Sequence, residues 1–368
     1  MNKKVLFIGH SYHKKTASSK FIEQMLQEKY EVECVYDESW LHSEKGFDSS
    51  SFNLDDYYAI IIWQIADLLP SDFIAELSKR NTIFFPMENY WDDWNKWKKY
   101  KKFKIISFSK FNYSKLKQWG FDVQYFQYFP KPKETPFDLK KNRYTVFFWQ
   151  RVNALTWKEI KRLINYKDIE KVILHKSVDP GHQFLMPSAA DIKKYNIEIT
   201  EWFNDKAELE DKIAQVDIYI APRITEGIGL SFLEAMAMGK AVVAVNMPTM
   251  NEYIEHRKNG YLFDIHHIHQ INFSDIESIR KNCIKSVERG FERWNAQKQE
   301  IYNIVERHYS PNRKLLFKQI IQDACRKAVL KAKRILKEAT PFLIIMLRQR
   351  YLRTNMRNKG HRLDERIL

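Results

Sequence analysis

Residues 225–240 read TEGIGLSFLEAMAMGK and are the most informative segment of the sequence. The apolar run before them, residues 217–221, predicts a strand, and the apolar spacing after the second glycine predicts a helix over 231–238. Glycine is scarce, with 10 among 368 residues, so the closely spaced Gly227 and Gly229 have a positional meaning. Glycine lets the backbone approach a ligand closely. The segment therefore predicts a strand, a ligand-binding loop and a helix in succession.

The predicted helix start is suited to bind an anion. The first backbone amides of a helix have no partner within it, and the helix dipole favours negative charge there. Glu226 lies in the loop and Glu234 about one turn into the helix, so these carboxylates can contact different parts of one elongated ligand. The alternative is an ordinary helix start with an acidic first turn. We expect a diphosphate to be bound by Gly227, Ile228, Gly229, Leu230 and Ser231.

Short apolar runs alternate with helical patterns, which predicts right-handed βαβ units and parallel sheets. We expect an α/β fold with two facing, doubly wound, Rossmann-like domains over 1–130 and 144–310, joined by a Pro-rich linker over 131–143. A last helix near 291–308 is expected to cross back to the first domain. The expected strands are 5–8, 32–36, 58–63, 82–86, 104–108, 145–149, 171–175, 217–221 and 241–245.

The sequence around the two glutamates resembles the E-x7-E signature of family 4 retaining glycosyltransferases of the GT-B fold, which belong to the glycosyl transferases of group 1. The flanks are similar as well: Asp217 at the strand start, the strand 241–244, and the segments NEYI (251–254) and NGYL (259–262). The resemblance is specific over about 199–264. It implies the GT-B fold and transfer of a sugar from a nucleotide-diphospho-sugar with retention of configuration.

The resemblance also implies roles for three residues. Glu226 matches the glutamate that contacts hydroxyls of the donor sugar, and Glu234 matches the glutamate that binds the nucleotide ribose. Arg151, after the predicted strand 145–149, matches the arginine that neutralises the diphosphate. The alternative for Arg151 is a salt bridge on the surface or between domains.

The family also uses a lysine near this arginine, and this chain departs from that pattern. Trp157 occupies roughly the expected place, which leaves Lys176, after the next strand, as the candidate catalytic cation and Lys158 as a candidate nucleotide ligand. Cations aimed at a leaving diphosphate stabilise the charge that develops there, by roughly a few kcal/mol each. No Asp-x-Asp occurs in the chain, so we expect no metal cofactor. The resemblance implies that the departing phosphate helps to deprotonate the acceptor hydroxyl.

The loop after the first predicted strand reads GHSYH, residues 9–13. GT-B proteins often carry a glycine-rich loop here that faces the diphosphate, so Gly9 is a candidate nucleotide ligand. His10 and His13 are either structural or close to the acceptor. Glu88 and Asn89, after the strand 82–86, are candidates for the acceptor side.

Two further patterns each have a functional and a structural interpretation. Trp91, Trp94 and Trp97 precede a group of lysines, which suits either a membrane interface or a core-facing helix stripe with a solvated lysine face. The cluster of His266, His267 and His269 suggests a metal site, but a solvated loop explains it better.

The net charge of +15 is concentrated in the C-terminal tail. Residues 311–368 carry 16 Lys and Arg against 4 Asp and Glu, so the other 310 residues are nearly neutral. Apolar residues at helical spacing from Phe317 predict a basic amphipathic helix, which we expect Pro341 to end. Such a tail binds an anionic lipid surface, a protein partner or a nucleic acid, and the neutral body makes nucleic acid the least favoured partner.

These observations predict a metal-independent, retaining glycosyltransferase whose acceptor is a lipid-linked glycan or a surface polysaccharide precursor, such as lipopolysaccharide or capsule. The tail would hold it peripherally on the inner face of the cytoplasmic membrane. No apolar run is long enough to span a bilayer, and the three separated cysteines fit a reducing compartment. The alternatives are a nucleotide-sugar epimerase, a non-catalytic GT-B assembly subunit and, less favoured, a nucleic-acid-binding protein.

Overall fold

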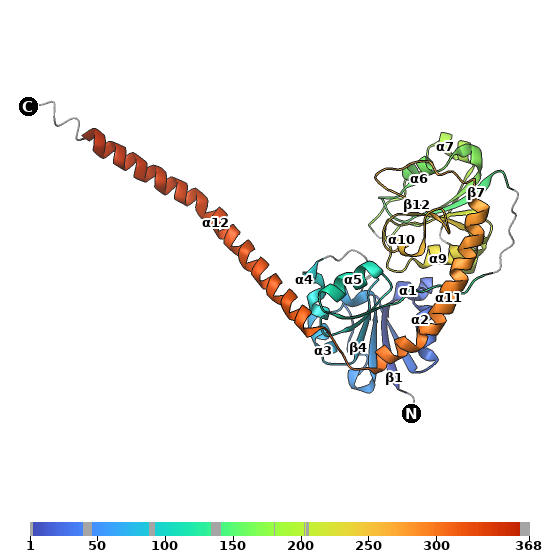
Figure 1. Cartoon of the computed structure of the whole chain (residues 1–368), viewed down its shortest axis with the longest axis horizontal. Helices are drawn as coiled ribbons and strands as arrows, with labels where there is room; N and C mark the ends of the chain where they lie inside the picture. Colours follow the sequence, from blue (N-terminus) through green and yellow to red (C-terminus); the bar gives the residue numbers. More distant parts are fainter. Residues whose placement is uncertain are drawn as a thin grey trace, which may run out of the picture. The chain divides into compact units, whose positions relative to one another are not determined.

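The computed structural model describes residues 3–39, 46–87, 93–133, 141–179, 181–201, 203 and 206–360, without the side chains of Lys15 and 339–360. The chain divides into two units, Met1–Pro311 and Asn312–Leu368. The larger unit contains two parallel β-sheets with helices around them, and the smaller one contains a long helix (Figure 1).

The first sheet consists of six parallel strands in the order β2-β1-β3-β4-β5-β6. Its central strand β3 reads AIIIW and is buried along its whole length, as expected for a parallel strand covered on both faces. The strands are β1 (Lys4–His10), β2 (Glu31–Asp37), β3 (Ala59–Trp63), β4 (Thr82–Phe85), β5 (Lys104–Ser107) and β6 (Asp122–Tyr125). The accompanying helices are α1 (Ser11–Thr16), α2 (Lys20–Gln27), α3 (Ser71–Leu77), α4 (Trp94–Trp97) and α5 (Lys110–Gln118), with the 3-10 turns η1 (Leu54–Asp56), η2 (Ile65–Asp67) and η3 (Lys98–Tyr100).

The second sheet also consists of six parallel strands, in the order β12-β11-β10-β7-β8-β9. Its strands are β7 (Tyr144–Gln150), β8 (Ile169–Lys176), β9 (Ile197–Thr200), β10 (Ile218–Ile220), β11 (Ala241–Val245) and β12 (Tyr261–Phe263). The helices are α6 (Trp157–Leu163), α7 (Ala189–Tyr195), α8 (Lys206–Ala214), α9 (Leu230–Ala237), α10 (Met250–Tyr253) and α11 (Ile276–Glu306), with η4 (Tyr166–Asp168). The predicted α/β fold with two Rossmann-like sheets is confirmed. The strands β6, β9 and β12 were not predicted. They lie at the edges of the two sheets, and β6 (DVQY) and β9 (IEIT) lack the continuous apolar run of a buried central strand.

Helix α11 connects the two sheets. Near its start, Arg280 donates a hydrogen bond to Asp217 of the second sheet at 3.1 Å. Near its end, the Tyr302 hydroxyl donates to the Met25 carbonyl of α2 at 2.6 Å. The sequence predicted only the second half of this helix, which begins at Ile276.

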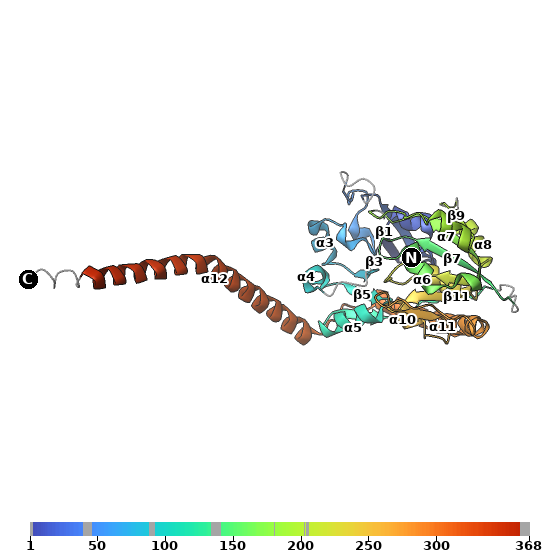
Figure 2. The same ribbon diagram turned by 90° about the horizontal axis from the view of Figure 1, so that it is seen from above.

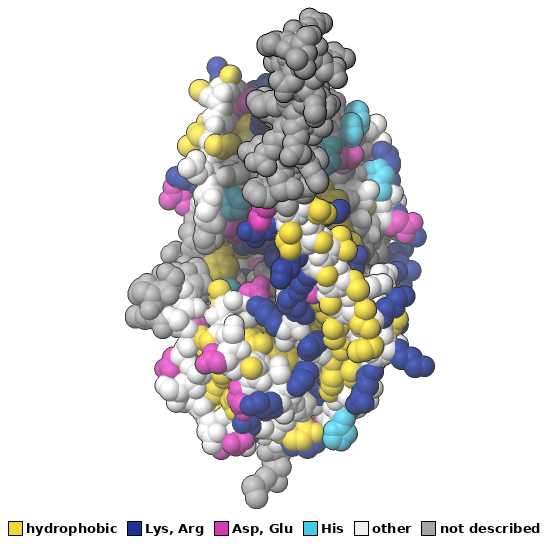
Figure 3. Space-filling view, turned by 90° about the vertical axis from the view of Figure 1, so that its left-hand side faces the viewer, with side chains coloured by type: hydrophobic (Ala, Val, Ile, Leu, Met, Phe, Trp, Pro, Cys, Tyr) yellow, Lys and Arg dark blue, Asp and Glu magenta, His cyan; other side chains and the backbone are white. Residues whose placement is uncertain are grey.

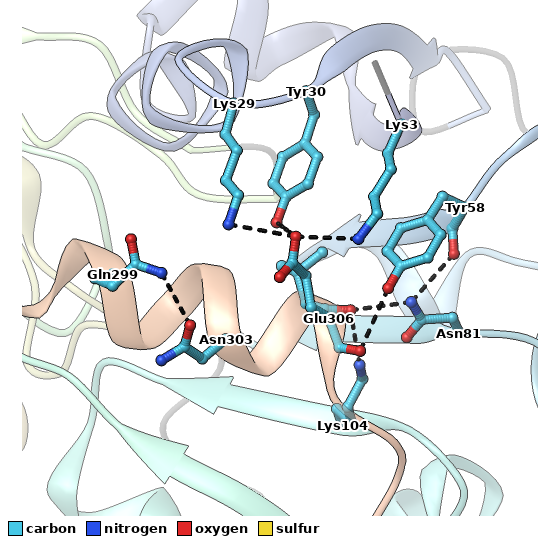
Figure 4. Close-up of polar contacts among 10 residues, drawn as sticks. Lys3, Lys29, Tyr30, Tyr58, Asn81, Lys104, Gln299, Asn303 and Glu306 are labelled. Atoms are coloured by element: carbon cyan, nitrogen blue, oxygen red, sulfur yellow. Dashed lines mark hydrogen bonds and ion pairs between the residues drawn. The ribbon is translucent and has the colours of Figure 1, made fainter. Parts of the chain in front are cut away.

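The end of α11 is held by side chains of the first half of the larger unit (Figure 4). The buried Lys104 ammonium donates to the carbonyls of Ile304 at 2.6 Å and Arg307 at 2.8 Å, which supplies partners for carbonyls at the helix terminus. Lys3 and Lys29 pair with the Glu306 carboxylate at 3.2 and 3.3 Å. Burial lowers the pKa of Lys104 to about 8. The chain therefore returns to the first sheet after completing the second.

A second contact between the halves involves α10 and α5 (Figure 2). The Glu252 carboxylate of α10 accepts hydrogen bonds from the backbone amides of Lys110 at 2.7 Å and Phe111 at 3.2 Å. A carboxylate at a helix start satisfies unpaired amides and complements the dipole. Glu252 thus caps α5 from the other half of the unit.

The tryptophans of α4 are core residues. Trp94 packs edge-on against Trp119 and Phe121, and Trp97 packs against Tyr100; both tryptophans are buried. The core-facing interpretation is therefore correct for these two rings, and they are not available to a membrane. Trp91 lies outside the described residues.

The smaller unit contains α12 (Arg313–Gly360), which continues through Pro341. The prediction that the proline ends the helix is wrong. An interior proline removes one backbone donor and costs about 3 kcal/mol, but the Leu, Ile, Met and Arg residues around it are mostly good helix formers. In Figure 3, hydrophobic side chains form a strip along the described part of α12, beside Lys and Arg side chains. The large apolar side chains that are exposed on the described part of α12 are Leu315, Phe317, Ile320, Ile321, Val329, Leu330, Ile335 and Leu336. Among the described helices, none is long and apolar enough to cross a membrane.

Candidate active site

A cavity of about 500 Å³ lies at the carboxyl ends of the strands and is lined by both halves of the larger unit. Ligands of open α/β sheets bind at this edge. We call its two sides the first wall and the second wall. The first wall comprises His10, Tyr12, His13, Thr16, Ser18, Trp63, Gln64, Ile65, Asp67, Leu68 and Met87. The second wall comprises Trp149, Arg151, His175, Asp179, Phe203, Lys206, Leu209, Arg223, Glu226, Gly227, Ile228, Gly229, Leu230, Ser231 and Glu234.

The start of α9 lies in the second wall, as the 225–240 segment led us to expect. Gly229 is the N-cap, with φ 71° and ψ 46°, in the left-handed region that favours glycine. A Cβ there would lie 1.9 Å from the ring of Phe232, so this turn also requires the absence of a side chain. No side chain caps the helix start through a hydrogen bond. The turn therefore presents the first helical residues, Leu230 and Ser231, to the cavity.

Gly227 lies where the two walls meet. A Cβ on this residue would lie 2.2 Å from the Met87 carbonyl oxygen, which belongs to the loop after β4. That atom is backbone, so it cannot move aside as a flexible side chain would. The absence of a side chain at position 227 thus allows the two walls to approach each other.

Glu226 occupies the loop before α9. The Thr249 hydroxyl donates to its backbone carbonyl at 2.7 Å, which fixes the loop from the far side. Burial raises the pKa of the Glu226 carboxyl, while the charges of Arg223 and then Arg151 oppose that rise. The carboxylate therefore lies in a poorly solvated place next to two cations.

Glu234 lies farther along α9 and forms an ion pair with Lys206 of α8. Both side chains line the cavity, and the Glu234 side chain is only 19% exposed. A carboxylate held by one lysine keeps acceptor capacity on its other lone pairs. Glu226 and Glu234 are thus separate acidic positions along one wall.

Arg151 follows β7 and pairs with Asp179, which follows β8. Its Nε and Nη2 donate to one carboxylate oxygen of Asp179 at 2.9 and 2.6 Å. Arg223, which follows β10, donates to the other oxygen at 2.5 Å. Because β8, β7 and β10 are neighbours in the sheet, their carboxyl ends bring these three residues together.

Three other predicted site residues are not in the lining of the cavity. Lys176 ends β8 next to His175, which does line it, and successive strand side chains point to opposite faces. Lys176 instead pairs with Glu201 at 3.2 Å. Lys158 lies on the exposed side of α6, and Gly9 lies within β1, packed near Phe7 and Tyr36. The three residues expected to face the nucleotide thus lie outside the lining of this cavity.

The sequence interpretation missed Asp179, Arg223 and Lys206. Arg223 lies three residues before Glu226 in the same loop, so its position was a usable signal. Lys206 begins α8, and Asp179 follows β8 by three residues, but neither belongs to a motif. Their proximity to the glutamates becomes apparent only when the strands are placed side by side.

Two histidines form part of the first wall. The rings of His10 and His13 stack with centroids 3.9 Å apart, and His13 Nε2 lies 2.9 Å from Gln64 Oε1. Burial lowers the pKa of His10 to about 4 and that of His13 to about 3. Gln64 has a φ of +69°, an unusual value for a residue with a side chain. Glu88 and Asn89 lie outside the described residues.

The other histidine cluster is an exposed loop. His266, His267 and His269 are all exposed, and His267 Nδ1 lies 3.0 Å from Asp264. Within the described part of the chain, no group of three or more His, Cys, Asp or Glu side chains is arranged to hold a metal ion.

Residues 157–272 match the family of glycosyl transferases group 1. This segment includes both glutamates of the cavity, together with Asp179, Lys206 and Arg223. The resemblance predicted from the E-x7-E context is thereby confirmed. An uncharacterized glycosyltransferase of Haemophilus influenzae is 40% identical over 55 residues, which represent 15% of this chain and 16% of that protein.

Solved structures share the fold over most of the chain. The crystal structure of Anabaena HepE in complex with UDP and glucose is 14% identical, with a TM-score of 0.57 over 82% of this chain and 99% of that one. Sucrose-phosphate synthase from Thermosynechococcus elongatus is 12% identical, with a TM-score of 0.59 over 82% and 98%. At this level of identity the similarity establishes the GT-B fold, and the segment that matches the group 1 family lies in its second half.

Proposed function

We propose that the protein is a retaining glycosyltransferase that moves a sugar from a nucleotide-diphospho-sugar to a glycan acceptor without a metal cofactor. The observation that carries this proposal is the arrangement of Glu226, Glu234 and the start of α9 along one wall of a single cavity. The group 1 family match supports the activity. UDP in the HepE crystal structure, on a shared fold, supports a nucleotide donor.

In this proposal the diphosphate lies at the start of α9, between the two glutamates. Glu226 accepts hydrogen bonds from hydroxyls of the donor sugar, and Glu234 accepts them from the ribose. Arg151 faces the charge that develops on the diphosphate as the glycosidic bond breaks, and such preorganised cations lower the barrier. The leaving phosphate accepts the acceptor's proton, and the acceptor oxygen bonds to the anomeric carbon on the face that the phosphate leaves.

We further propose that α12 binds an anionic membrane surface and that the acceptor is a lipid-linked glycan or a surface polysaccharide precursor. The support is charge complementarity: the tail combines a strip of exposed apolar side chains with a large excess of Lys and Arg. Each basic residue near such a surface contributes about 1 kcal/mol. In this proposal the enzyme works peripherally, on the inner face of the cytoplasmic membrane.

Nucleotide binding and turnover test the catalytic proposal. Thermal unfolding is followed with UDP, GDP, TDP and ADP sugars, because a ligand that binds the folded state raises the melting temperature. Glu226→Ala and Glu234→Ala are expected to lose most of the turnover while melting as the parent does. Full activity in both variants would overturn the site, and no shift with any sugar nucleotide would favour a non-catalytic assembly subunit. Product formation without any acceptor would indicate an epimerase.

Truncation tests the membrane proposal. The larger unit, ending at Pro311, is expected to lose binding to vesicles that contain phosphatidylglycerol while it still glycosylates a soluble acceptor. A full-length variant with Lys331, Lys333, Arg334 and Lys337 changed to Gln keeps the helix and removes four charges. Its vesicle binding shows how much of the binding by α12 depends on charge. Undiminished vesicle binding by the truncated protein would refute the role of α12. Salt-sensitive binding to oligonucleotides in preference to vesicles would identify a nucleic-acid partner instead.

A further inference from the structure

The cavity contains an arginine that no family motif predicts, and its surroundings resemble an anion site. Arg151 and Arg223 both donate to the Asp179 carboxylate, one to each oxygen. The two arginines thus share the Asp179 carboxylate, and the Glu226 carboxyl lies near both of them. Asp179 holds two guanidinium groups side by side in the lining of one cavity, an arrangement that suits a ligand with several anionic oxygens.

Hydrogen-bond capacity supports the same view. An arginine has five N–H donors in a fixed planar fork, and this fork suits phosphate oxygens. The contact with Asp179 uses one Nη atom of Arg223, and its Nε is buried without a hydrogen-bond partner. A buried donor left unsatisfied costs roughly 1–3 kcal/mol, so a ligand oxygen at this position would be favoured.

The location of Arg223 indicates which part of a sugar nucleotide it would contact. Arg223 lies on the chain between β10 and Glu226, and its charge is the strongest influence opposing the rise in the pKa of Glu226. It is therefore close to the carboxylate proposed to hold the donor sugar, in the same wall as the start of α9. The diphosphate is the part of a sugar nucleotide that adjoins the sugar.

We infer that Arg223, aligned with Arg151 by their shared partner Asp179, is the second cation that binds the diphosphate of the donor. This inference rests on the proposed function. The sequence suggested Lys176 or Lys158 as the second cation. We assign this role instead to Arg223, which follows β10. An arginine binds two phosphate oxygens through its fork, whereas a lysine acts as a point charge.

Binding constants for matched nucleotides test this role. The nucleoside diphosphate that gives the largest thermal shift is compared with its monophosphate by calorimetry, in the full-length protein and in Arg223→Gln. We expect the Kd of the diphosphate to rise about tenfold, which corresponds to about 1.4 kcal/mol, and that of the monophosphate to change less than twofold. Arg223→Lys should recover part of the difference. Lys176→Gln is the matched control, since it removes a cation from a neighbouring strand end outside the cavity, and should leave both constants unchanged.

The outcomes separate the inference from the proposed function. If the parent protein binds none of the nucleoside diphosphates, the proposed function fails. If it binds one and Arg223→Gln keeps the full preference for diphosphate over monophosphate, only the inference fails. An equal loss of affinity for both nucleotides, accompanied by a lower melting temperature, would show that Arg223 merely supports the fold. Arg223→Lys, which keeps the charge, maintains the test if Arg223→Gln does not fold.

Discussion

The two walls of the cavity differ in the number of charged side chains that they carry. In the second wall, Arg151 and Arg223 pair with Asp179, and Lys206 pairs with Glu234, so these charged side chains have partners of opposite charge. In the first wall, the stacked imidazoles of two histidines are kept neutral by burial. Asp67, which is also in the first wall, pairs with Lys99 at 2.7 Å.

This difference indicates which substrate each wall suits. An arginine that pairs with a protein carboxylate can bind a phosphate in its place, so the number of buried charges changes little. In the proposed function the charged nucleotide donor therefore lies at the second wall. Neutral imidazoles donate or accept single hydrogen bonds without attracting an anion, so in the proposed function the hydroxyl-bearing acceptor lies at the first wall. The following predictions test this comparison, beginning with the largest expected effect.

Glu226→Gln removes the carboxylate of the second wall while keeping its size. We expect kcat to fall by about 10² to 10³, since one preorganised electrostatic contact at a reacting centre contributes on that order. Initial rates at saturating donor measure this loss. A loss of less than tenfold would show that the second wall does not contact the reacting sugar.

Gly227→Ala challenges the junction of the two walls. The added Cβ would overlap the Met87 carbonyl, and relieving such an overlap costs about 1–3 kcal/mol. The two walls must move apart to relieve the overlap. At about 1.4 kcal/mol per factor of ten, this cost corresponds to a fall of about 5- to 150-fold in kcat/KM.

Gly9→Ala is the control for that variant. A Cβ at position 9 would have its nearest neighbour, an atom of the Phe7 ring, at an ordinary 3.4 Å. Its activity should stay within about twofold of the parent. If both glycine variants behave alike, the close approach at Gly227 has no functional role.

Lys206→Gln removes the partner of Glu234 in the second wall. We expect the KM for the donor to rise about tenfold with a smaller change in kcat, because an unpaired Glu234 is no longer held in place for the ribose. Lys158→Gln, on the exposed side of α6, should change KM by less than about twofold. Steady-state kinetics at varied donor concentration distinguishes the two. Equal KM values for the two variants would remove Lys206 from the site.

The neutral histidines of the first wall make stability depend on pH. The folded pKa of His13, about 3, lies below the value of 6.5 that it has when unfolded, so the unfolded chain binds more protons between these values. Stability should therefore fall as the pH drops from about 6.5, by up to about 1.4 kcal/mol per pH unit for this residue.

Urea unfolding at pH 7, 6 and 5 measures this dependence. In His13→Gln the loss of unfolding free energy between pH 7 and pH 5 should be smaller by about 1–2 kcal/mol. His269→Gln, in the exposed loop, should match the parent. An identical pH dependence in His13→Gln and the parent would mean that the first wall tolerates a charged imidazole.

Much of the second wall was predictable from local sequence. The loop and helix of residues 225–240 carry their own signals, since glycines, a preceding strand and spaced glutamates are contiguous in the chain. Glu226 and Glu234 both reached the cavity as expected. The cations were less predictable, because a strand end gives the position of a side chain but not the face to which it points. Lys176 comes directly after His175 in β8, and successive side chains of a strand point to opposite faces. His175 lines the cavity and Lys176 does not.

By itself, the sequence determined the two parallel sheets, the helix start at Gly229 and the basic tail, because each depends on periodicity or composition within a short segment. The tertiary structure decided which cations meet the glutamates, that Gly227 lies against Met87, and that α11 returns to the first sheet. Those features join residues far apart in the chain. Only the packing of whole strands and helices brings such residues within hydrogen-bonding distance of one another.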